Sequence, residues 1–241
     1  LDRNGFKLSS ANSINWGRLV PQIVYYFSAY ADLLASGEIK TGDEINVVVP
    51  TGNFGNILAS YYAKKMGLPI KKFICASNEN NVLTDFIKTG VYDKTRQFHT
   101  TISPSMDILI SSNLERFLYD LSGCNDSLIS NLMTQLNTVG KYEIPADIKA
   151  VMQDLFDADF CDDKETMATI KKTYVDGGYV VDTHTAVGKC VYDKYVSRTG
   201  DTTKTIICST ASPFKFNQSV LIALEDYNYV TGKNEFELLD L

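Results

Sequence analysis

The sequence has few of the residues that hold metal ions or cross-link small secreted domains. It contains two histidines and five cysteines, and no two cysteines stand in a CxxC pair. Widely spaced cysteines of odd number argue against a disulfide framework, and with so few histidines they also argue against a structural zinc site. We therefore expect a cytoplasmic protein whose thiols stay reduced and whose site holds no metal.

Long apolar runs and an excess of basic residues are also absent. No stretch approaches the roughly 20 apolar residues that a membrane-spanning helix needs, and the residues after Leu1 lack the pattern of a signal peptide. The net charge of −6 argues against nucleic acid as a partner, because binding to a polyanion requires a concentrated basic face. We expect neither a membrane nor a nucleic-acid partner. Because the first residue is not methionine, we also expect the chain to be part of a longer protein.

The clearest signal that is present is a glycine loop between a strand and a helix. Three valines, residues 47–49, predict a buried parallel strand, and residues 53–65 continue at helical spacing. Gly52 and Gly55 let backbone amides converge without a Cβ in the way, and the helix start adds unpaired N–H groups. The loop therefore predicts a phosphate site, although a single glycine loop is a weak motif and a tight turn without a ligand is the alternative.

The stretch around this loop predicts the fold class. Residues 70–76 form a second apolar run after Gly67 and Pro69, so strand, helix and strand follow one another as a βαβ unit, which requires a parallel sheet. With 241 residues, 44% of them hydrophobic, the chain can bury one large core. We predict an α/β fold with three layers, a parallel sheet with helices on both faces, as one domain over residues 1–241.

Most of the remaining chain predicts helices. We expect helices over residues 19–34, 81–88 and 107–119, a short strand from 179 leading into a helix that ends near 197, a strand over 205–209 and a last helix near 213. Residues 123–178 predict helix throughout, and we interpret them as a helical insertion at the periphery of the sheet. Its acids lack the spacing of a calcium loop, so we expect a solvated face rather than a metal site; they are Asp157, Asp159, Asp162 and Asp163.

A second candidate anion site precedes the first helix. Asn12, Ser13 and Asn15 are short hydrogen-bonding side chains, and any of them could cap that helix. Arg18 follows within the first turns. A guanidinium beside amide and hydroxyl donors forms a fork for a phosphate or a carboxylate, so we also interpret the segment as an anion site.

The ends of the predicted strands indicate where a ligand lies. Residues 78–81 follow the second strand, and ligands of parallel sheets bind beyond the carboxyl ends of the strands. Glu79 stands where a dinucleotide fold would hold ribose, but the loop reads G-N-F-G and lacks G-x-G-x-x-G, which excludes a nicotinamide site. His184, at the entrance to a later helix, faces either the core or the cleft.

Four motifs together resemble the threonine synthase family, pyridoxal-phosphate (PLP) enzymes of fold type II, the tryptophan synthase β-like fold. They are S-A-N-S-I-N-W-G-R (10–18), V-P-T-G-N-F-G-N (49–56), D-T-H-T-A-V (182–187) and S-T-A-S-P-F-K-F (209–216). The resemblance extends from residue 9 to about residue 220.

The resemblance implies a role for each matching residue. The residues that would wrap the phosphate of PLP are Gly52, Asn53, Phe54, Gly55 and Asn56. Thr210 would hydrogen-bond the pyridine nitrogen. Asn12, Ser13 and Arg18 would grip the phosphate of the substrate, O-phosphohomoserine. The implied reaction converts O-phospho-L-homoserine and water to L-threonine and phosphate by γ-elimination and β-hydration.

One feature of the family has no counterpart here. The lysine that forms the Schiff base lies in a family segment that precedes the one matching Leu1, and no lysine of this sequence stands in its motif. We therefore expect the missing N-terminal part of the same enzyme to be a partner, and this chain to be inactive alone. The alternatives are another fold-type II lyase or dehydratase, which would not need Arg18, and a non-catalytic phosphate-binding module.

Overall fold

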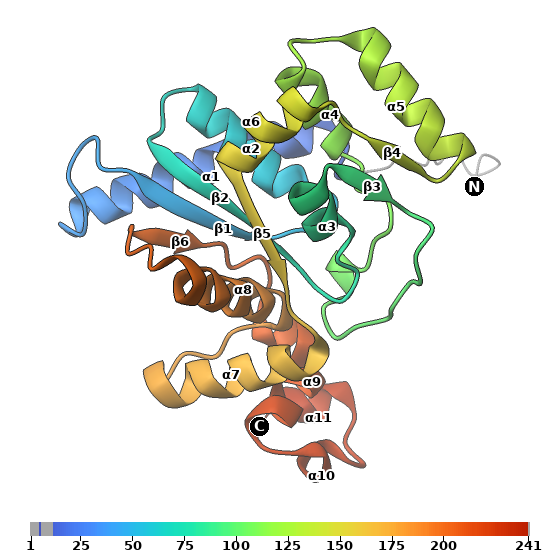
Figure 1. Ribbon diagram of the computed structural model, residues 1–241. Coiled ribbons are helices and arrows are strands. Elements are labelled where there is room, and N and C mark those ends of the chain that lie inside the picture. The colour runs from blue at the N-terminus through green and yellow to red at the C-terminus, as the bar shows by residue number, and fades with distance from the viewer. Residues whose placement is uncertain (1–4, 6–11, 241) are drawn as a thin grey trace.

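A four-stranded parallel sheet organises the structure, a computed structural model that describes residue 5 and residues 12–240 (Figure 1). The strand order is β5-β2-β1-β6. The strands are β1 (Ile45–Pro50), β2 (Ile70–Ser77), β5 (Phe156–Phe160) and β6 (Thr205–Ile207). All three pairings are parallel, so the carboxyl ends of the strands meet at one edge.

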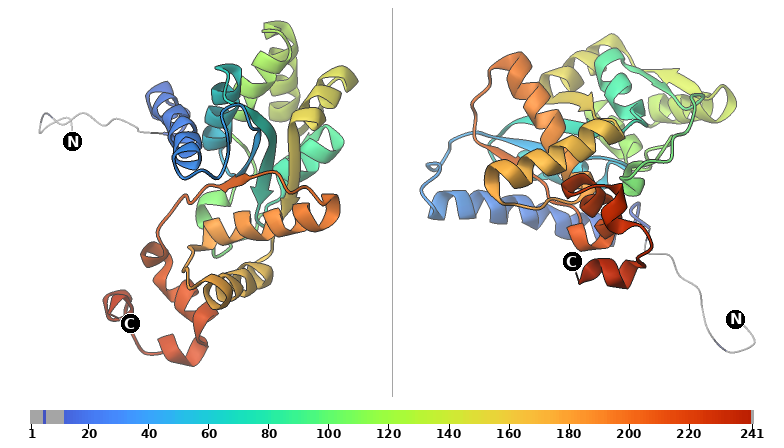
Figure 2. Two further views of the ribbon diagram at one scale, coloured as in Figure 1. Left: turned by 90° about the vertical axis from the view of Figure 1, so that its left-hand side faces the viewer. Right: turned by 90° about the horizontal axis from the view of Figure 1, so that it is seen from below.

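Helices cover both faces of the sheet because the central strand is apolar on both sides. Every residue of β1 is buried; Val47 and Val49 belong to the larger core cluster, whereas Val48 belongs to a second cluster. On the first face lie α1 (Trp16–Ala35), α2 (Gly55–Lys65), α3 (Val82–Thr89), α4 (Leu114–Leu121), α5 (Asp126–Thr138) and α6 (Ala146–Leu155). On the second face lies α8 (Thr183–Thr199), with α7 (Asp163–Gly177) beyond it (Figure 2). The predicted three-layer α/β fold is confirmed.

Smaller elements complete the chain. They are the antiparallel pair β3 (Val91–Asp93) and β4 (Lys141–Glu143), the 3-10 turns η2 (Pro104–Met106) and η3 (Pro213–Phe216), and the closing helices α9 (Asn217–Leu224), α10 (Tyr227–Val230) and α11 (Glu235–Leu239). Among the described residues, no helix combines the length and the apolarity needed to cross a membrane.

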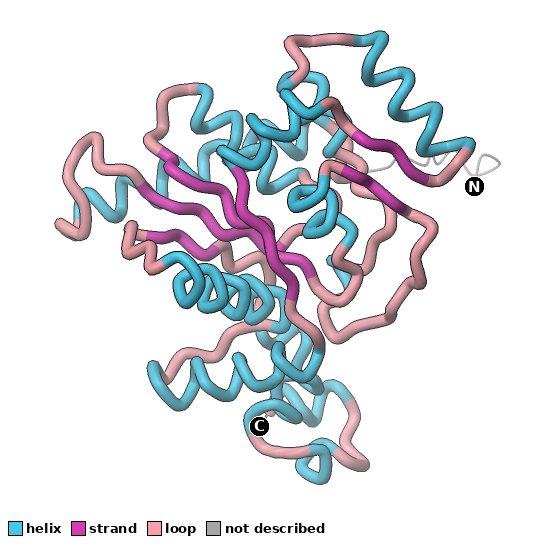
Figure 3. Tube along the Cα trace, viewed as in Figure 1, coloured by secondary structure: helices cyan, strands magenta, loops and turns pink. Residues whose placement is uncertain are grey.

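The prediction that residues 123–178 are helical throughout is wrong. This stretch supplies β4 and also β5, an edge strand of the main sheet that pairs with β2 (Figure 3). Acidic residues on the strand conceal it in the sequence, but they are not a solvated face. Asp157 pairs with Arg198 at 2.6 Å, and Asp159 pairs with Lys88 at 3.3 Å.

Two shorter predictions are also wrong. Helix α4 begins at Leu114 rather than at residue 107, because Asp107, Ser111 and Asn113 direct their polar groups to other loops instead of to a helix. Residues 179–181 form no strand. Val181 packs with the small cluster that contains Val220, and the chain passes directly into α8.

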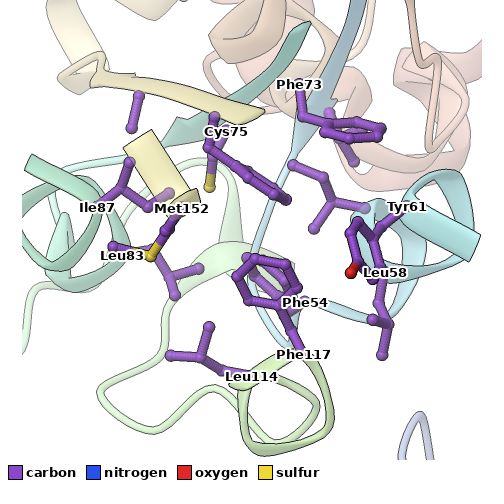
Figure 4. Close-up of a cluster of buried hydrophobic side chains, with 14 of the residues drawn as sticks. Phe54, Leu58, Tyr61, Phe73, Cys75, Leu83, Ile87, Leu114, Phe117 and Met152 are labelled. Carbon is purple, nitrogen blue, oxygen red and sulfur yellow. The ribbon is translucent and has the colours of Figure 1, made fainter. Parts of the chain in front are cut away.

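A cluster of aromatic side chains joins the glycine loop to the edge strand (Figure 4). The ring of Phe156 on β5 lies 5.0 Å from that of Phe73 on β2, 4.9 Å from that of Phe117 on α4 and 5.9 Å from that of Phe54 in the loop. Strand β5, which the sequence did not predict, therefore packs against the glycine loop through the ring of Phe156.

Replacing Phe156 with alanine tests that support. We expect Phe156→Ala to lower the free energy of unfolding by about 3 to 5 kcal/mol, because a buried phenyl ring leaves a cavity behind. The control is Val151→Ala on the exposed face of α6, where we expect a change below about 0.5 kcal/mol. Urea denaturation of both variants measures the difference, and equal losses would contradict the packing role.

Candidate active site

A cavity of about 510 Å³ opens beyond the carboxyl ends of β1 and β6. This volume lies in the range of small-molecule sites. Its lining includes all nine residues to which the family resemblance assigns a role, namely Asn12, Ser13, Arg18, Gly52, Asn53, Phe54, Gly55, Asn56 and Thr210. Ser10 and Ala11, which belong to the first motif, lie outside the described residues. The two candidate anion sites therefore share one cavity, although they are separated in the sequence by the whole of α1 and β1.

Gly52 is required by the close approach of another segment. A Cβ built on Gly52 would lie 2.6 Å from the backbone oxygen of Ser105 and 3.3 Å from Cα of Met106. Both atoms belong to a backbone that cannot swing aside as a side chain would. Any side chain at position 52 would push the segment around Ser105 away from the loop.

Phe54 turns the chain so that α2 can begin at once. Its φ of 62° lies in the left-handed region, which costs a non-glycine residue about 1 to 3 kcal/mol. Burial of the phenyl ring, which is 1% exposed, offsets this cost. Leu58 N–H donates to the Phe54 carbonyl at 3.0 Å, so the N–H groups of Gly55, Asn56 and Ile57 have no acceptor within the helix. These amides and the helix dipole make this end of the cavity suited to an anion.

Two polar residues that the sequence analysis missed hold the glycine loop from outside. Ser111 Oγ donates to the Gly52 carbonyl at 2.8 Å. Asn113, which is fully buried, donates from Nδ2 to the Asn53 carbonyl at 2.9 Å and to the Ser13 carbonyl at 3.3 Å. Asn113 thus joins the two candidate anion sites. No local motif marks either residue, because each acts on a loop about 60 positions away in the chain.

The polar residues around the start of α1 have two roles: some stabilise the turn and the helix start, and others line the cavity. Asn15 caps α1 by accepting from Gly17 N–H at 2.9 Å, which confirms one of the three predicted caps. Asn12 Oδ1 accepts from Ile14 N–H at 3.0 Å and so shapes the turn. Helix α1 begins at Trp16, three residues earlier than expected. Arg18 therefore stands in the first turn of the helix and lines the cavity.

Tyr26 on α1 fixes the orientation of Asn56. The tyrosine hydroxyl bonds the side-chain oxygen of Asn56 and lies 3.1 Å from its backbone oxygen. Burial raises the pKa of Tyr26 well above its usual value, with the neighbouring Cys208 adding to the effect, so the hydroxyl keeps its proton and donates. With its oxygen engaged in this way, Asn56 has its amide nitrogen left as a donor.

His184 is buried and also lines the cavity, so both interpretations of its position are partly right. Its Nε2 accepts from Ser105 N–H at 3.1 Å, and its Nδ1 lies 3.2 Å from Asp182 Oδ1. These partners place the proton on Nδ1. Burial alone would raise the pKa of Asp182, but hydrogen bonds from His184 and Thr185 outweigh burial and hold it below its usual range. The pair anchors the segment that presses on Gly52.

The polar residues after β2 organise the same segment rather than a ribose site. Asn78 Nδ2 donates to Asp107 Oδ1 at 2.7 Å and to Thr101 Oγ1 at 2.9 Å, and Asn80 Nδ2 donates to the His99 carbonyl at 2.8 Å. This network holds residues 99–107 against the end of the sheet. The loop after β2 therefore positions the wall of the cavity.

Further residues line the cavity that the sequence analysis did not assign to a site. They are Gln22, Val49, Pro50, Thr51, Ile57, Ser105, Met106, Ala211 and Lys215. Thr210 lies in the loop after β6, and Lys215 follows it in η3. In the sequence, the position of Lys215 shortly after Thr210 indicates that this lysine lies near the cavity.

Comparisons with known proteins support one family. A family model, "Threonine synthase, C-terminal", matches residues 185–239. Threonine synthase-like 1 of Homo sapiens is 50% identical over 222 residues, which are 92% of this chain and 30% of that protein. Threonine synthase of Saccharomyces cerevisiae is 38% identical over 242 residues, covering 94% of this chain and 46% of that protein. A crystal structure of PLP-bound threonine synthase from Brucella melitensis matches with a TM-score of 0.84 and 36% identity, covering 97% of this chain and 48% of that chain.

The parallel sheet, its two helical layers and the glycine loop at its carboxyl edge are those of the fold-type II class of PLP enzymes. Within this class, the chain belongs to the threonine synthase family. It spans about half of the length of the threonine synthases and 30% of the length of the threonine synthase-like relatives.

Replacing Gly52 with alanine tests the close approach of Ser105. We expect Gly52→Ala to lower the free energy of unfolding by about 1 to 3 kcal/mol, because the added methyl group has no space. Gly177→Ala is the matched control, since a Cβ there meets nothing within 4 Å and the site is at the end of a helix. Thermal unfolding of both variants makes the comparison. A Gly52→Ala protein as stable as the control would show that the two segments are not pressed together.

The depressed pKa of Asp182 predicts a pH dependence of stability. A carboxyl whose pKa is lower in the folded state stabilises above its unfolded pKa of about 3.9 and loses this contribution as the pH falls. We therefore expect Asp182→Asn to destabilise the protein at pH 7, and the difference from the native protein to shrink as the pH falls below about 5 and through the lowered pKa of the folded state. Urea unfolding at several pH values measures it, with the exposed Asp126→Asn as the charge control. A difference that stays constant with pH would refute this role of the carboxylate.

Proposed function

We propose that this chain forms the major part of the cofactor-binding domain of a threonine synthase. The enzyme converts O-phospho-L-homoserine and water to L-threonine and phosphate, and works in the cytoplasm. The observation that carries the proposal is the single cavity in which the glycine loop and the Asn12–Arg18 segment face a shared space, with Asn113 bonded to both. Two oxyanion sites in one cavity suit a phosphorylated cofactor and a phosphorylated substrate.

The residues of the glycine loop fit the phosphate of PLP. Free amides at the start of α2, a neutral donor on Asn56 and the absence of acidic residues in the first turn of that helix all favour a ligand that carries its own negative charge. When bound, PLP supplies an electron sink for reactions at the carbons of an amino acid. Thr210 would bond the pyridine nitrogen; its hydroxyl does not hold that nitrogen protonated, as a carboxylate would, which makes the sink a mild one.

The opening segment fits the phosphate of the substrate. A guanidinium stays charged at all physiological pH values and presents parallel N–H donors, which match a phosphate better than an ammonium does. Asn12 and Ser13 add neutral donors beside Arg18 on the same wall. The same fork that binds the substrate phosphate would also stabilise the negative charge on phosphate as it leaves.

We infer that the Schiff-base lysine comes from a part of the parent protein outside these 241 residues. Lys215 lines the cavity, but it stands in the S-T-A-S-P-F-K-F motif and not in the motif of the Schiff-base lysine. On this basis the chain alone binds ligands without catalysing the reaction, and the rest of the parent enzyme is its partner.

A second candidate function follows from the degree of identity. The relatives named threonine synthase-like 1 share 50% of matched residues with this chain, against 38% for the yeast threonine synthase. Another fold-type II lyase would release phosphate from the same substrate without adding water at the β-carbon, and hydrolysis of the remaining unsaturated amine by one water would then yield 2-oxobutyrate and ammonia in place of threonine. Incubation of the full-length protein with PLP and O-phosphohomoserine separates the two, since threonine supports the first candidate and 2-oxobutyrate the second. Release of neither product would contradict both.

Replacing Arg18 with alanine in the full-length enzyme tests the assignment of the two anion sites. We expect KM for O-phosphohomoserine to rise about 10- to 100-fold, the equivalent of a lost charge-assisted hydrogen bond, with a less than about twofold change in PLP affinity. Lys189→Ala, which removes an exposed cation paired with Asp193, is the control. Steady-state kinetics and PLP titration by absorbance provide both readouts. Equal losses of substrate and cofactor binding would overturn the assignment.

A further inference from the structure

Two cysteines form a buried pair on the second face of the sheet. Cys161 directly follows β5, and Cys190 lies in the middle of α8; both belong to the core cluster that contains Val48. Their sulfur atoms and a carboxylate oxygen of Glu165 all lie within 4.8 Å of one another. Cys161 is fully buried and Cys190 is 8% exposed, so only a small molecule could reach the pair through Cys190.

The carboxylate in this group is already engaged. Glu165 Oε2 accepts from Asp162 N–H at 3.2 Å as part of the capping box of α7, and Lys194 Nζ lies 2.8 Å from the same oxygen. An ammonium in this position would repel a metal cation. Cys161 Sγ lies 3.3 Å from Thr166 Oγ1 and donates to the Asp162 carbonyl at 3.5 Å, and Cys190 Sγ lies within 4.8 Å of Cys161 Sγ.

The surroundings make the two thiols unequal. The neighbouring Cys161 thiol lowers the pKa of Cys190 most, and Lys194, one helical turn further along α8, and Thr169 lower it further; burial and Glu165 oppose this shift. The pKa of Cys161 is raised, first by the neighbouring Cys190 and then by burial, and its thiol donates to the Asp162 carbonyl at 3.5 Å. Cys190 is thus the nucleophile, and Cys161 holds the proton.

We propose that Cys161 and Cys190 are a redox-active dithiol, which a hydroperoxide oxidises to an intrachain disulfide. The Cys190 thiolate attacks one oxygen of hydrogen peroxide, forms a sulfenic acid and releases hydroxide. The Cys161 sulfur then attacks the Cys190 sulfur, and the hydroxyl group leaves as water with the Cys161 proton. In total two thiols lose two electrons and two protons, and the peroxide is reduced to two molecules of water.

The other cysteines lack this arrangement. Burial raises the pKa of Cys75 to about 12 and that of Cys208 to about 11, and Cys208 contacts Tyr26 rather than a second thiol. Cys124 is exposed. Peroxide would therefore reach Cys124 by exposure alone, but only Cys161 and Cys190 are placed to capture a sulfenic acid within the chain.

Peptide mapping of the full-length protein tests the proposal. The protein carries Cys124→Ser, is reduced, and is then treated with hydrogen peroxide before alkylation and digestion without reductant. We expect a cross-linked peptide containing residues 161 and 190, with a mass about 2 Da below the sum of its parts. We expect free Cys190 to disappear about tenfold faster than free Cys75, and dithiothreitol to restore both thiols.

Two variants sharpen the result. Lys194→Gln removes the cation without touching either sulfur, and we expect it to slow the loss of Cys190, whereas Lys189→Gln on the same helix leaves the rate unchanged. Cys190 that oxidises no faster than Cys75, that ends as a sulfinic acid without a cross-link, or that pairs with Cys208 would overturn the proposal. If the Lys194→Gln protein fails to fold, the peptide map of the protein that retains Lys194, Cys161 and Cys190 still decides whether the disulfide forms.

Discussion

The contact between two backbones, at Gly52 and Ser105, is the constraint on which the cavity depends. The central strand ends at Pro50, and the chain must turn immediately into α2 while a second segment passes within the space of one missing methyl group. That second segment is held from the other side by His184, and by Asn78 through Asp107. Hydrogen bonds from α8 and from the loop after β2 therefore hold one close contact, and both lose their geometry if the contact opens.

This arrangement also explains how a loop can present its amides to a ligand. Carbonyl groups of Gly52 and Asn53 are taken by Ser111 and Asn113, which lie behind the loop. Because these carbonyl oxygens already accept hydrogen bonds, the polar groups that the turn offers to a ligand are its N–H groups and those at the start of α2. Phe54 also helps to fix the loop before any ligand binds. The cost of its left-handed backbone conformation is offset by the contacts of its ring with Phe117 and Phe156 and not by a ligand. The site is preorganised by packing.

The sequence predicts local features well and distant ones poorly, for physical reasons. The strand, the two glycines and the helix of residues 45–65 are contiguous, so hydrophobic pattern and turn chemistry specify them together. Asn113 acts on Asn53 and on Ser13, which are brought near only by tertiary packing. The edge strand β5 was missed because its five residues, F-D-A-D-F, alternate correctly but include two aspartates, a residue type that is depleted in strands. The partners that neutralise Asp157 and Asp159 are Arg198 and Lys88, which come from distant helices.

Helix α8 connects the candidate active site with the cysteine pair. Its first turn holds His184 through Asp182, and Cys190 lies less than two turns further along the same helix. A helix transmits a shift along its axis as a nearly rigid body, so a bond that tied Cys190 to the end of β5 would restrain the element that positions Ser105. By linkage the reverse also holds. A ligand that binds more tightly to one position of α8 changes the equilibrium constant for forming the disulfide. Met106 adds a second link, because it lines the cavity and packs in the same core cluster as Cys161 and Cys190.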